Sequence, residues 1–432
     1  MIATLLFTAF AIMMLAGVPI GAAMGLAGAA CIALANVDVQ WFGLLAVPQN
    51  FYAGLGKYPL LAIPMFVLVG SIFDRSGVAA RLVNFAIAIV GRGPGMLPIV
   101  AIAVAMFMGG ISGSGPATAA AVGGVMIAAM SRAGYPAAFS ASVVGAAAAT
   151  DILIPPSIAF IVYSVLVPGA SVPALFAAGM IPGVMVGLAL MVPSLWLARR
   201  HGMGKLEAEL PRPPFWRSLR EASWGLVAPV LILGGMRAGW FTPTEAAVVA
   251  VFYGLFVGMV IHRTIKVRDL FVILRESGEL SAVILIVVAL AGIFAFSLST
   301  LGVIDPVTQA IVNSGLGEFG VLMLLVLMLV VVGMVLDGVS IFLIFVPLLW
   351  PIMQHYQWNP VWFGVLLTLL VALGQFTPPM AVNLMVSCRI AGVGMDQTVR
   401  WVRWLVASMF VVIMAVLQWP QLALWLPTKL GY

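Results

Sequence analysis

The chain contains 432 residues, of which 63% are hydrophobic and 8% are charged, and its formal net charge is +6. The surface of a soluble domain alone needs ~25% charged residues, so the composition excludes a soluble protein and predicts an all-α polytopic membrane protein. We attribute the positive charge to Lys and Arg on cytoplasmic loops and expect no binding to nucleic acid.

The first 198 residues predict a series of membrane helices. Apolar helices are expected at 3–16, 19–35, 59–74 and 172–198, and amphipathic helices at 41–55 and 78–91. The first apolar stretch lacks the basic residues that begin a signal peptide, so we interpret it as a membrane-spanning helix. Cys31 and Cys388 lie in apolar segments without metal-ligand spacing and are expected to be small buried residues.

The segment 97–130 is interpreted as a helical hairpin that enters the membrane and leaves on the same side. Its 34 residues are too many for one crossing of ~20 residues and few for two crossings with a turn. Its middle, Gly109-Gly-Ile-Ser-Gly-Ser-Gly-Pro116, would expose backbone and hydroxyl groups at membrane depth. Lipid does not allow this unless the tip lines an enclosed cavity, so the hairpin predicts a binding site.

The segment 137–168 is predicted to be a broken membrane helix. Pro155 and Pro156 remove two backbone donors and clash with the preceding turn. The half-helices then present free ends within the membrane, amide ends that attract anions and carbonyl ends that attract cations. Pro116 is expected in the first turn of the hairpin's second arm, whose free amides suit a carboxylate.

A polar linker at 199–221 separates two halves that share the same order of landmarks. The linker contains six of the twenty Lys and Arg residues. Three landmarks recur after 224, 223 and 223 positions: Pro19 and Pro243, Gly115 and Gly338, and Pro155-Pro156 and Pro378-Pro379. Such an offset is hard to obtain by chance in apolar sequence, so we predict a two-fold repeat.

The repeats are predicted to cover 1–198 and 222–432, and the second contains a hairpin at 319–354 and a broken helix at 360–390. With a cytoplasmic linker and hairpins that do not cross, the first repeat makes five crossings, an odd number, so the repeats are inverted. Seventeen basic residues then lie inside and three lie outside, namely Lys57, Arg237 and Lys429, in agreement with the positive-inside rule. Both termini are expected on the periplasmic side.

Two acidic residues lie at membrane depth, where a carboxylate is costly and is therefore a functional candidate. Asp151 lies four residues before Pro155, and Asp337 lies at the tip of the second hairpin. Each carboxylate is either a ligand or proton carrier, or a side chain satisfied by a helix cap or a neighbouring helix.

Neutral oxygens accompany these acids. They come from Ser112, Ser114, Thr118 and Ser340 at the tips, and from Thr150, Ser157, Gln375, Thr377 and Asn383 near the double prolines. Oxygens without thiolate or imidazole ligands suit a hard monovalent cation and not zinc or iron. The alternative is that these small residues let helices approach closely and bond to their own backbone. The anionic substrate is expected at the free helix ends, at Gly115, Thr118, Asp151, Pro155, Pro156, Ser157, Pro378 and Asn383.

Intramembrane hydrolases fit less well. Gly110-Ile-Ser112-Gly matches a serine protease pattern, but His201, His262 and His355 all fall in loops or at helix ends, so the necessary base is missing. Neither aspartate lies in the Gly-x-Gly-Asp context of an aspartyl protease. The Gly-rich runs precede no strand and no Lys-Ser/Thr pair, which excludes nucleotide binding. We expect no enzyme activity and no organic cofactor.

Five motifs occur together: Ile63-Pro-Met-Phe66, Gly109-Gly-Ile-Ser-Gly-Ser-Gly-Pro-Ala117, Ile154-Pro-Pro-Ser157, Leu175-Phe-Ala-Ala-Gly-Met-Ile-Pro-Gly183 and Phe376-Thr-Pro-Pro379. In combination they resemble the DctM-type large membrane subunit of TRAP (tripartite ATP-independent periplasmic) transporters over essentially the full chain. The resemblance implies an elevator-type transporter of the ion-transporter superfamily in the bacterial inner membrane. It implies sodium-coupled uptake of an organic acid, a small four-helix membrane subunit as a separate chain, a periplasmic binding protein and surrounding membrane lipids.

The resemblance also implies residue roles. Sodium ligands are implied at Ser112, Gly113, Ser114, Asp337, Gly338, Ser340 and Thr377. Asp151 lies where many members are expected to have a small residue, which indicates a variant substrate or ion preference. The arms 41–55, 78–91 and 266–275 are expected in the scaffold that meets the small subunit, and the hairpins and broken helices in the mobile transport domain. The alternative is a stand-alone sodium- or proton-coupled anion transporter of the same superfamily.

Overall fold

The computed structural model describes residues 2–35, 40–90, 93–209 and 212–432, which form helices and turns without a strand. The first half contains α1 (Ile2–Leu15), α2 (Ile20–Ala35), α3 (Gln40–Leu55), η2 (Tyr58–Leu61), α4 (Ala62–Arg75), α5 (Val78–Val90), α6 (Met96–Ser112), α7 (Gly115–Arg132), α8 (Ala137–Ala147), η3 (Ala148–Ile152), α9 (Ile158–Leu166) and α10 (Val172–Arg200). After η4 (Lys205–Glu209), the second half contains α11 (Phe215–Arg237), α12 (Pro243–Leu255), η5 (Phe256–Ile261), α13 (Val267–Thr300), α14 (Ile304–Val312), α15 (Gly317–Gly333), α16 (Gly338–His355), α17 (Pro360–Gly374), α18 (Val382–Ala391), η6 (Met395–Thr398), α19 (Val399–Gln418) and α20 (Gln421–Leu430). The predicted all-helical fold is confirmed.

Six helices in the described part of the chain are long and apolar enough to cross a membrane. They comprise η2 with α4, α10, α12 with η5, α13, α16, and η6 with α19. Shorter apolar helices, including α6, α8 and α15, accompany them. A helix of about 20 apolar residues spans the hydrocarbon core of a bilayer, so the chain is a multi-pass membrane protein.

Elements of the second half follow their counterparts in the first at a nearly constant offset. α7 begins at Gly115 and α16 at Gly338, 223 positions later, and α8 and α17 begin at Ala137 and Pro360, again 223 positions apart. One pair of counterparts differs in form. The first half is interrupted after α3, before η2 and α4, whereas α13 runs unbroken for 34 residues.

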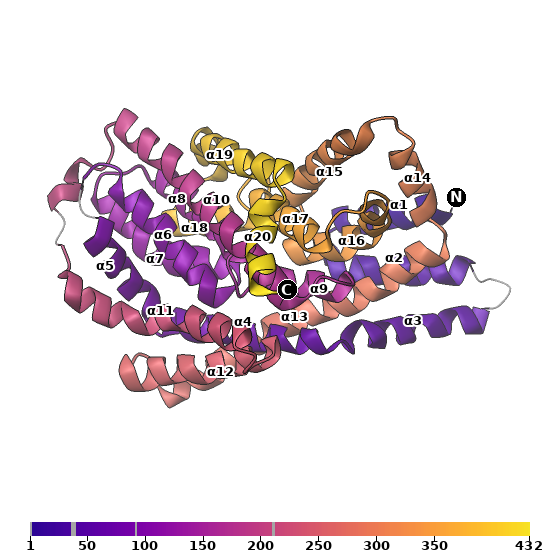
Figure 1. Ribbon diagram of the computed structural model, residues 1–432, viewed down its shortest axis with the longest axis horizontal. Coiled ribbons are helices and arrows are strands. Elements are labelled where there is room, and N and C mark those ends of the chain that lie inside the picture. Colours follow the sequence, from indigo (N-terminus) through magenta and orange to yellow (C-terminus); the bar gives the residue numbers. More distant parts are fainter. Residues whose placement is uncertain (1, 36–39, 91–92, 210–211) are drawn as a thin grey trace.

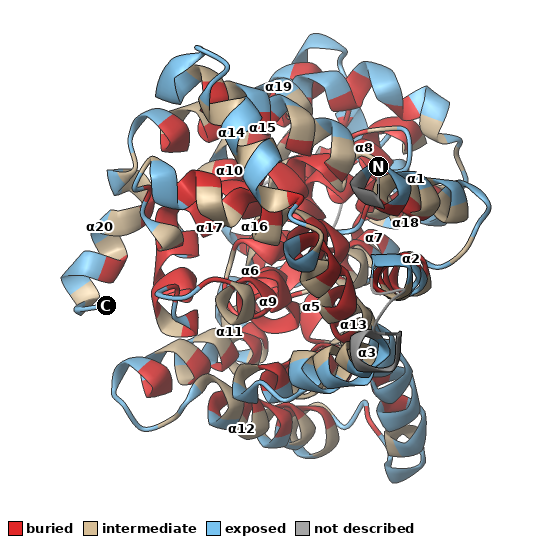
Figure 2. Cartoon of the chain, turned by 90° about the vertical axis from the view of Figure 1, so that its right-hand side faces the viewer, coloured by how far each residue is buried: buried red, intermediate tan, exposed pale blue. Residues whose placement is uncertain are grey.

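The two halves pack across each other in matching pairs. α2 packs along α13, while its counterpart α12 packs along α4; α9 packs on α16, while its counterpart α18 packs on α7. Glycines allow these close approaches: a Cβ at Gly28 of α2 would lie 3.2 Å from the backbone of Phe294, and a Cβ at Gly254 of α12 would lie 2.9 Å from the ring of Phe73. Figure 1 shows α2, α3 and α13 running together along one side, and Figure 2 shows buried residues concentrated in the interior.

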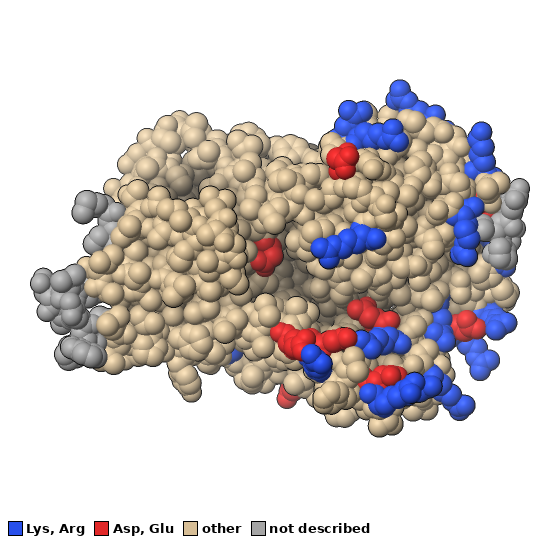
Figure 3. Space-filling view, turned by 180° about the vertical axis from the view of Figure 1, so that it is seen from behind, with Lys and Arg blue, Asp and Glu red and all other residues tan. Residues whose placement is uncertain are grey.

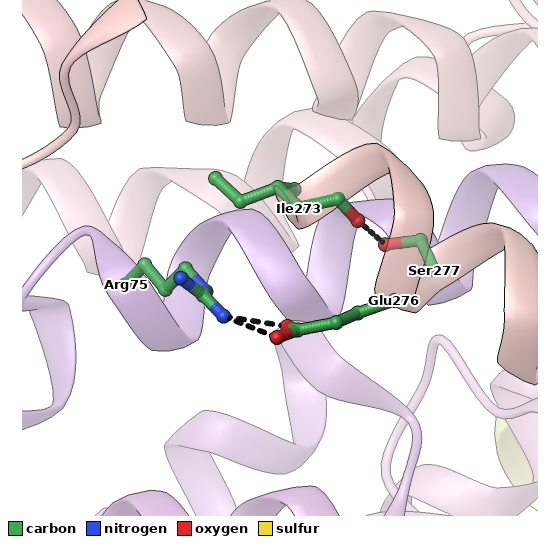
Figure 4. A network of polar contacts seen from close by, with 4 residues as sticks. All are labelled: Arg75, Ile273, Glu276 and Ser277. Carbon is green, nitrogen blue, oxygen red and sulfur yellow. Dashed lines mark hydrogen bonds and ion pairs between the residues drawn. The ribbon is translucent and has the colours of Figure 1, made fainter. Parts of the chain in front are cut away.

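Charged residues are unevenly distributed. On the face shown in Figure 3, Lys and Arg gather at one end of the long axis, and the other end of that face shows none. One ion pair joins the two halves: Arg75 at the end of α4 donates to both carboxylate oxygens of Glu276 on α13, at 2.7 and 2.6 Å (Figure 4). Nearby on α13, the Ser277 hydroxyl donates to the Ile273 carbonyl.

The region predicted as a linker, 199–221, contains the end of α10, η4 and the first turns of α11. Within it, the buried Glu207 accepts hydrogen bonds from the Leu97 N–H at 2.8 Å and the Tyr135 hydroxyl at 2.6 Å. That hydroxyl accepts from the Gly95 N–H at 2.7 Å. Burial raises the pKa of Glu207 and of Tyr135 above their ordinary values. The linker is thus attached to the base of the first hairpin.

Candidate functional site

The first hairpin turns over Gly113 and Ser114, between α6 and α7. Gly113 has φ 64° and ψ 13°, in the left-handed region that favours glycine, and Ser114 is the extended N-cap of α7. A Cβ at Gly113 would lie 2.6 Å from the carbonyl oxygen of Pro156, so the tip rests directly on the first double proline. Pro116 lies in the first turn of α7, as predicted.

The second hairpin turns at Asp337, which is the N-cap of α16. One carboxylate oxygen of Asp337 accepts from the N–H groups of Val339 and Ser340, at 3.1 and 3.2 Å. The other oxygen accepts a short hydrogen bond from the Ser340 hydroxyl. Of the two interpretations left open by the sequence, the geometry matches the helix cap; the exposed carboxylate still faces the space between the tips.

Both broken helices are interrupted at a cis proline pair, Pro155-Pro156 and Pro378-Pro379. After the first break, the Ser157 hydroxyl donates to the Ile152 carbonyl at 2.6 Å and accepts from the Phe160 N–H at 3.4 Å, which caps α9. These contacts hold the two ends of the break in fixed positions.

Around the second break, the polar groups bond mainly to one another. The Thr377 hydroxyl donates to the Leu373 carbonyl at 2.6 Å. The Asn383 side-chain amide donates to the Gln375 side-chain oxygen at 3.1 Å, and the Asn383 N–H donates to the Gln375 carbonyl at 3.0 Å. The chain between the half-helices is therefore closed into a compact loop rather than left open.

The tips of the two hairpins meet at one cavity of about 170 Å³. Its lining comprises Gly113, Ser114, Gly115, Pro116, Ile152, Ile158, Ala159, Ile284, Asp337, Gly338, Val339, Val371 and Gln375. The beginnings of α7 and α16 both face this cavity; α7 has no side-chain cap, so its first amide groups are available there, whereas the Val339 and Ser340 N–H groups of α16 are bound by Asp337. A Cβ at Gly115 would lie 2.7 Å from the amide atoms of Asn383, so the first tip also contacts the second broken helix.

A group of buried polar side chains lies beside the first tip. Ser112 is 1% exposed and Thr118 and Asp151 are 0% exposed, yet their side-chain oxygens have no hydrogen-bond partner. Glycines on two helices approach this group: a Cβ at Gly70 of α4 would lie 3.3 Å from the Ser112 carbonyl oxygen, and a Cβ at Gly109 of α6 would lie 2.9 Å from an Asp151 carboxylate oxygen. Polar atoms that are fully buried and unpaired are uncommon, so this group is a candidate binding site.

The structure brings seven of the residues singled out from the sequence to the cavity wall: Gly113, Ser114, Gly115, Pro116, Asp337, Gly338 and Gln375. Ser112, Thr118, Asp151, Ser157, Ser340, Thr377 and Asn383 are buried around it. Pro156 contacts the first tip, and Pro378-Pro379 forms the second break. Sequence reasoning missed the apolar wall residues Ile284 of α13 and Val371 of α17, because nothing distinguishes them from other membrane-helix residues.

Residues for hydrolytic or transition-metal chemistry are not gathered here. His201 and His262 are C-caps and His355 is the last residue of its helix, as predicted. Among the described residues, no three His, Cys, Asp or Glu side chains lie close enough together to hold a metal ion. The site offers hydroxyl, carboxylate and backbone groups, which suit a hard monovalent cation and a small anion.

Comparison with known proteins identifies strong similarity over nearly the whole chain. Residues 7–422 match the model of the DctM component of tripartite ATP-independent periplasmic transporters. The C4-dicarboxylate TRAP transporter large permease protein of Pseudomonas aeruginosa is 37% identical over 411 residues, 94% of each chain. The sialic acid TRAP transporter large permease protein of Vibrio cholerae is 32% identical over 421 residues, 97% of each chain.

A longer relative and a solved structure extend these similarities. The isethionate TRAP transporter permease protein of Oleidesulfovibrio alaskensis is 34% identical over 410 residues, and the match spans 95% of this chain and 64% of that protein. The crystal structure of the YdaH transporter of Alcanivorax borkumensis aligns with a TM-score of 0.58 at 13% identity, covering 88% of this chain and 90% of that one. At this identity the structural match supports the fold alone.

Proposed function

Because this chain belongs to the DctM component family of tripartite ATP-independent periplasmic transporters, we propose that it is the permease subunit of a sodium-coupled importer of an organic acid. Relatives in this family are named as transporter permease proteins, so the chain is a transport protein and not an enzyme. The family implies a tripartite system, and the proposed partners are a separate small four-helix membrane subunit and a periplasmic substrate-binding protein.

The observation that supports this proposal most directly is the meeting of the two hairpin tips at one cavity. Helix amide ends favour a carboxylate or similar anion, and the hydroxyl, carboxylate and carbonyl oxygens beside them favour a sodium ion. We assign sodium to the surroundings of Ser112, Gly113 and Ser114 at the first tip. A second sodium site would involve Asp337, Gly338, Ser340 and Thr377.

The substrate is proposed to be an organic anion held between the tips and the breaks. Its proposed surroundings are Gly115, Pro155, Pro156, Ser157, Pro378 and Asn383; Thr118 and Asp151, also expected there from the sequence, lie fully buried beside the first tip. The relatives named above are assigned to a C4-dicarboxylate, sialic acid and isethionate, all of which are anions. Each sodium ion that crosses with such an anion contributes roughly 2.3 kcal/mol per 100 mV of membrane potential, in addition to its concentration gradient.

Transport is proposed to follow an elevator mechanism, in which the hairpins and broken helices move as one body. The packing of α18 on α7 and α8, and of α9 on α16, joins these elements across the two halves. The scaffold would contain α3, α5 and α13, which include the three arms expected from the sequence, together with α4 and α12. α13 carries several exposed apolar side chains, including Phe271, Leu274, Val283 and Ile286, which suit contact with lipid and with the small subunit.

The proposed location is the bacterial inner membrane, with the linker in the cytoplasm and both termini in the periplasm. The gathering of Lys and Arg at one end of the face in Figure 3 favours this orientation, because basic residues concentrate on the cytoplasmic side.

The test is uptake of radiolabelled organic acids into proteoliposomes that contain the chain, with and without its small subunit and binding protein. Sodium and proton gradients are imposed separately, and a C4-dicarboxylate, sialic acid and isethionate are compared. We expect uptake only with all partners and an inward sodium gradient. Uptake by the chain alone, or driven by protons, would instead establish the stand-alone transporter of the same superfamily.

A further inference from the structure

The first half contains a buried carboxylate that its counterpart in the second half lacks. Asp151 belongs to η3 and is fully buried, with neither carboxylate oxygen in a hydrogen bond. Gly374 lies 223 positions later, at the equivalent place in α17, where it packs directly against Gly333. Asp151 packs against Gly109 of α6, where a Cβ would lie 2.9 Å from an Asp151 carboxylate oxygen, so the two halves differ in both residue and contact at this place.

Among the described residues, the surroundings of Asp151 itself supply oxygens, and the positive charge of Arg75 acts on Asp74 rather than on Asp151. The Thr118 side chain and the Ser114 backbone lie close enough to interact with the carboxylate, and Asp74 of α4 acts on it as a like charge. Thr118 is itself fully buried with an unpaired hydroxyl, and one Asp74 oxygen is also buried and unpaired. In the described part of the chain, neither Asp74 nor Asp151 belongs to an ion pair.

A fully buried carboxylate without a counter-charge is strongly disfavoured. An anionic substrate would add repulsion at this place, whereas a cation would provide the missing charge. The carbonyl end of α6, which terminates at Ser112, also favours positive charge. We propose that Asp151 and Thr118, with Asp74 at the edge, form an additional site for a monovalent cation in the first half alone.

This site is an addition to the sodium coupling proposed above. It rests on that proposed function only for the identity of the cation, sodium. It adds one ion to those at the two tips and has no equivalent in the second half. A carboxylate and a hydroxyl, without a cluster of three acidic, His or Cys ligands, match a hard monovalent ion better than a divalent or transition metal. A bound cation would neutralise Asp151 and remove repulsion of the anion in the neighbouring cavity.

The test is the number of ²²Na⁺ ions bound at saturation by the purified full chain in detergent. Asp151→Asn keeps the size of the side chain, and Asp151→Gly copies the residue of the second half, so folding is expected in at least one variant. Both are expected to bind one sodium ion fewer than wild type, and Thr118→Val to bind the ion several-fold more weakly. Thr150→Val is the matched control, because the buried Thr150 hydroxyl already donates to the Ala147 carbonyl at 2.7 Å.

Equal sodium numbers in wild type and both folded Asp151 variants would overturn the additional site, as would a wild type that binds no sodium. If Thr150→Val also binds one sodium ion fewer than wild type, the loss comes from altered packing, and this result too would overturn the additional site. Failure of the proposed function gives a different pattern. If the Asp151 variants lose one ion but no sodium gradient drives uptake, the site stands and the coupling fails.

Discussion

The two hairpins share a backbone frame but differ in how their polar groups are satisfied. Ser114 and Asp337 are N-caps 223 positions apart, yet the Asp337 carboxylate is fully engaged by its own helix, whereas the Ser114 side chain makes no cap bond. The first half instead places unpaired oxygens of Ser112, Thr118 and Asp151 behind the tip. The two halves thus share the turn geometry but differ in where the carboxylate lies. It lies at the hairpin tip in the second half and at the broken helix in the first half.

The bases of the two hairpins also have equivalent positions with different polar partners. Tyr135 and Trp358 are also 223 positions apart, and each binds a glutamate: Tyr135 donates to Glu207, and the Trp358 ring N–H donates to Glu318 at 2.8 Å. Glu318 belongs to the hairpin's own first arm, but Glu207 comes from the segment between the halves. Of these two contacts, only the one at the first hairpin therefore attaches a hairpin to the linker.

The largest effect is expected when the second half is given the carboxylate of the first. A Cβ at Gly374 would lie 2.4 Å from the carbonyl carbon and oxygen of Gly333, which are backbone atoms that cannot move aside. Gly374→Asp should lower the free energy of unfolding by roughly 3 kcal/mol or more, through overpacking and an uncompensated buried charge. Thermal unfolding of the purified chain in detergent measures this loss.

The control is Gly124→Ala on α7, where a Cβ would meet nothing within 4 Å. This change should stabilise the protein by about 0.5–1 kcal/mol, because alanine favours a helix over glycine. Wild-type stability in Gly374→Asp would mean that α15 and α17 are not in close contact.

The contact between linker and first hairpin should make stability depend on pH. Burial raises the pKa of Glu207 in the folded chain above 4.5, its ordinary value, so between these two values the folded state binds more protons than the unfolded state. The free energy of unfolding should therefore fall as pH rises from below 4.5 through the raised pKa. Glu207→Gln should remove this pH dependence, because the amide does not titrate, and its stability should come within about 1 kcal/mol of the protonated wild type at low pH.

Thermal unfolding measured from pH 4 to pH 8 compares Glu207→Gln with Glu318→Gln, the matched change at the second hairpin. An identical pH profile in wild type and Glu207→Gln would show that Glu207 does not titrate in this window.

The hairpin turn and the helix break of the first half could be predicted from the sequence, because the residues that cause them act on their own backbone. Glycine at the first tip and the double prolines restrict the backbone wherever they occur, so the hairpin and its break could be placed within a few residues. The attachment of Glu207 was missed because its partner Leu97 lies 110 positions away. Likewise, the two interpretations of Asp337 differ only in which atoms the carboxylate contacts, and this depends on three-dimensional packing.

A smaller effect is expected from adding one methyl group at equivalent positions of the two tips. In Gly115→Ala, the Cβ would lie 2.7 Å from both amide atoms of Asn383 and 2.9 Å from the Gln375 oxygen. This should separate the first tip from the second broken helix, cost about 1–2 kcal/mol and reduce uptake. In Gly338→Ala, the Cβ makes one close contact, 2.7 Å from a Val371 methyl group, instead of three, so the loss should be under about 1 kcal/mol. Equal losses of stability in Gly115→Ala and Gly338→Ala would contradict the expected difference in packing between the two tips.

Substitutions at Asp337 can distinguish its role as a helix cap from its proposed role as a sodium ligand. Asp337→Ala should cost about 1 kcal/mol, since it removes acceptors for the N–H groups of Val339 and Ser340. Asp337→Asn keeps an acceptor and should cost less, yet both should raise the sodium concentration needed for half-maximal uptake. Stability and uptake are measured on the same preparations. If Asp337→Asn takes up substrate with wild-type sodium dependence, the residue is a cap without a sodium role.

The smallest effect is expected at the ion pair between the halves. Arg75 and Glu276 are 39% and 51% exposed, so water screens their attraction even though two hydrogen bonds form (Figure 4). Arg75→Gln should change the free energy of unfolding by less than about 0.5 kcal/mol, and the difference should shrink further in high salt. The control is Arg217→Gln, which breaks a pair with Glu221 within α11 and joins no two helices. If Arg75→Gln costs clearly more than this control, the ion pair contributes to holding α4 against α13; if the two agree, apolar packing alone carries that contact.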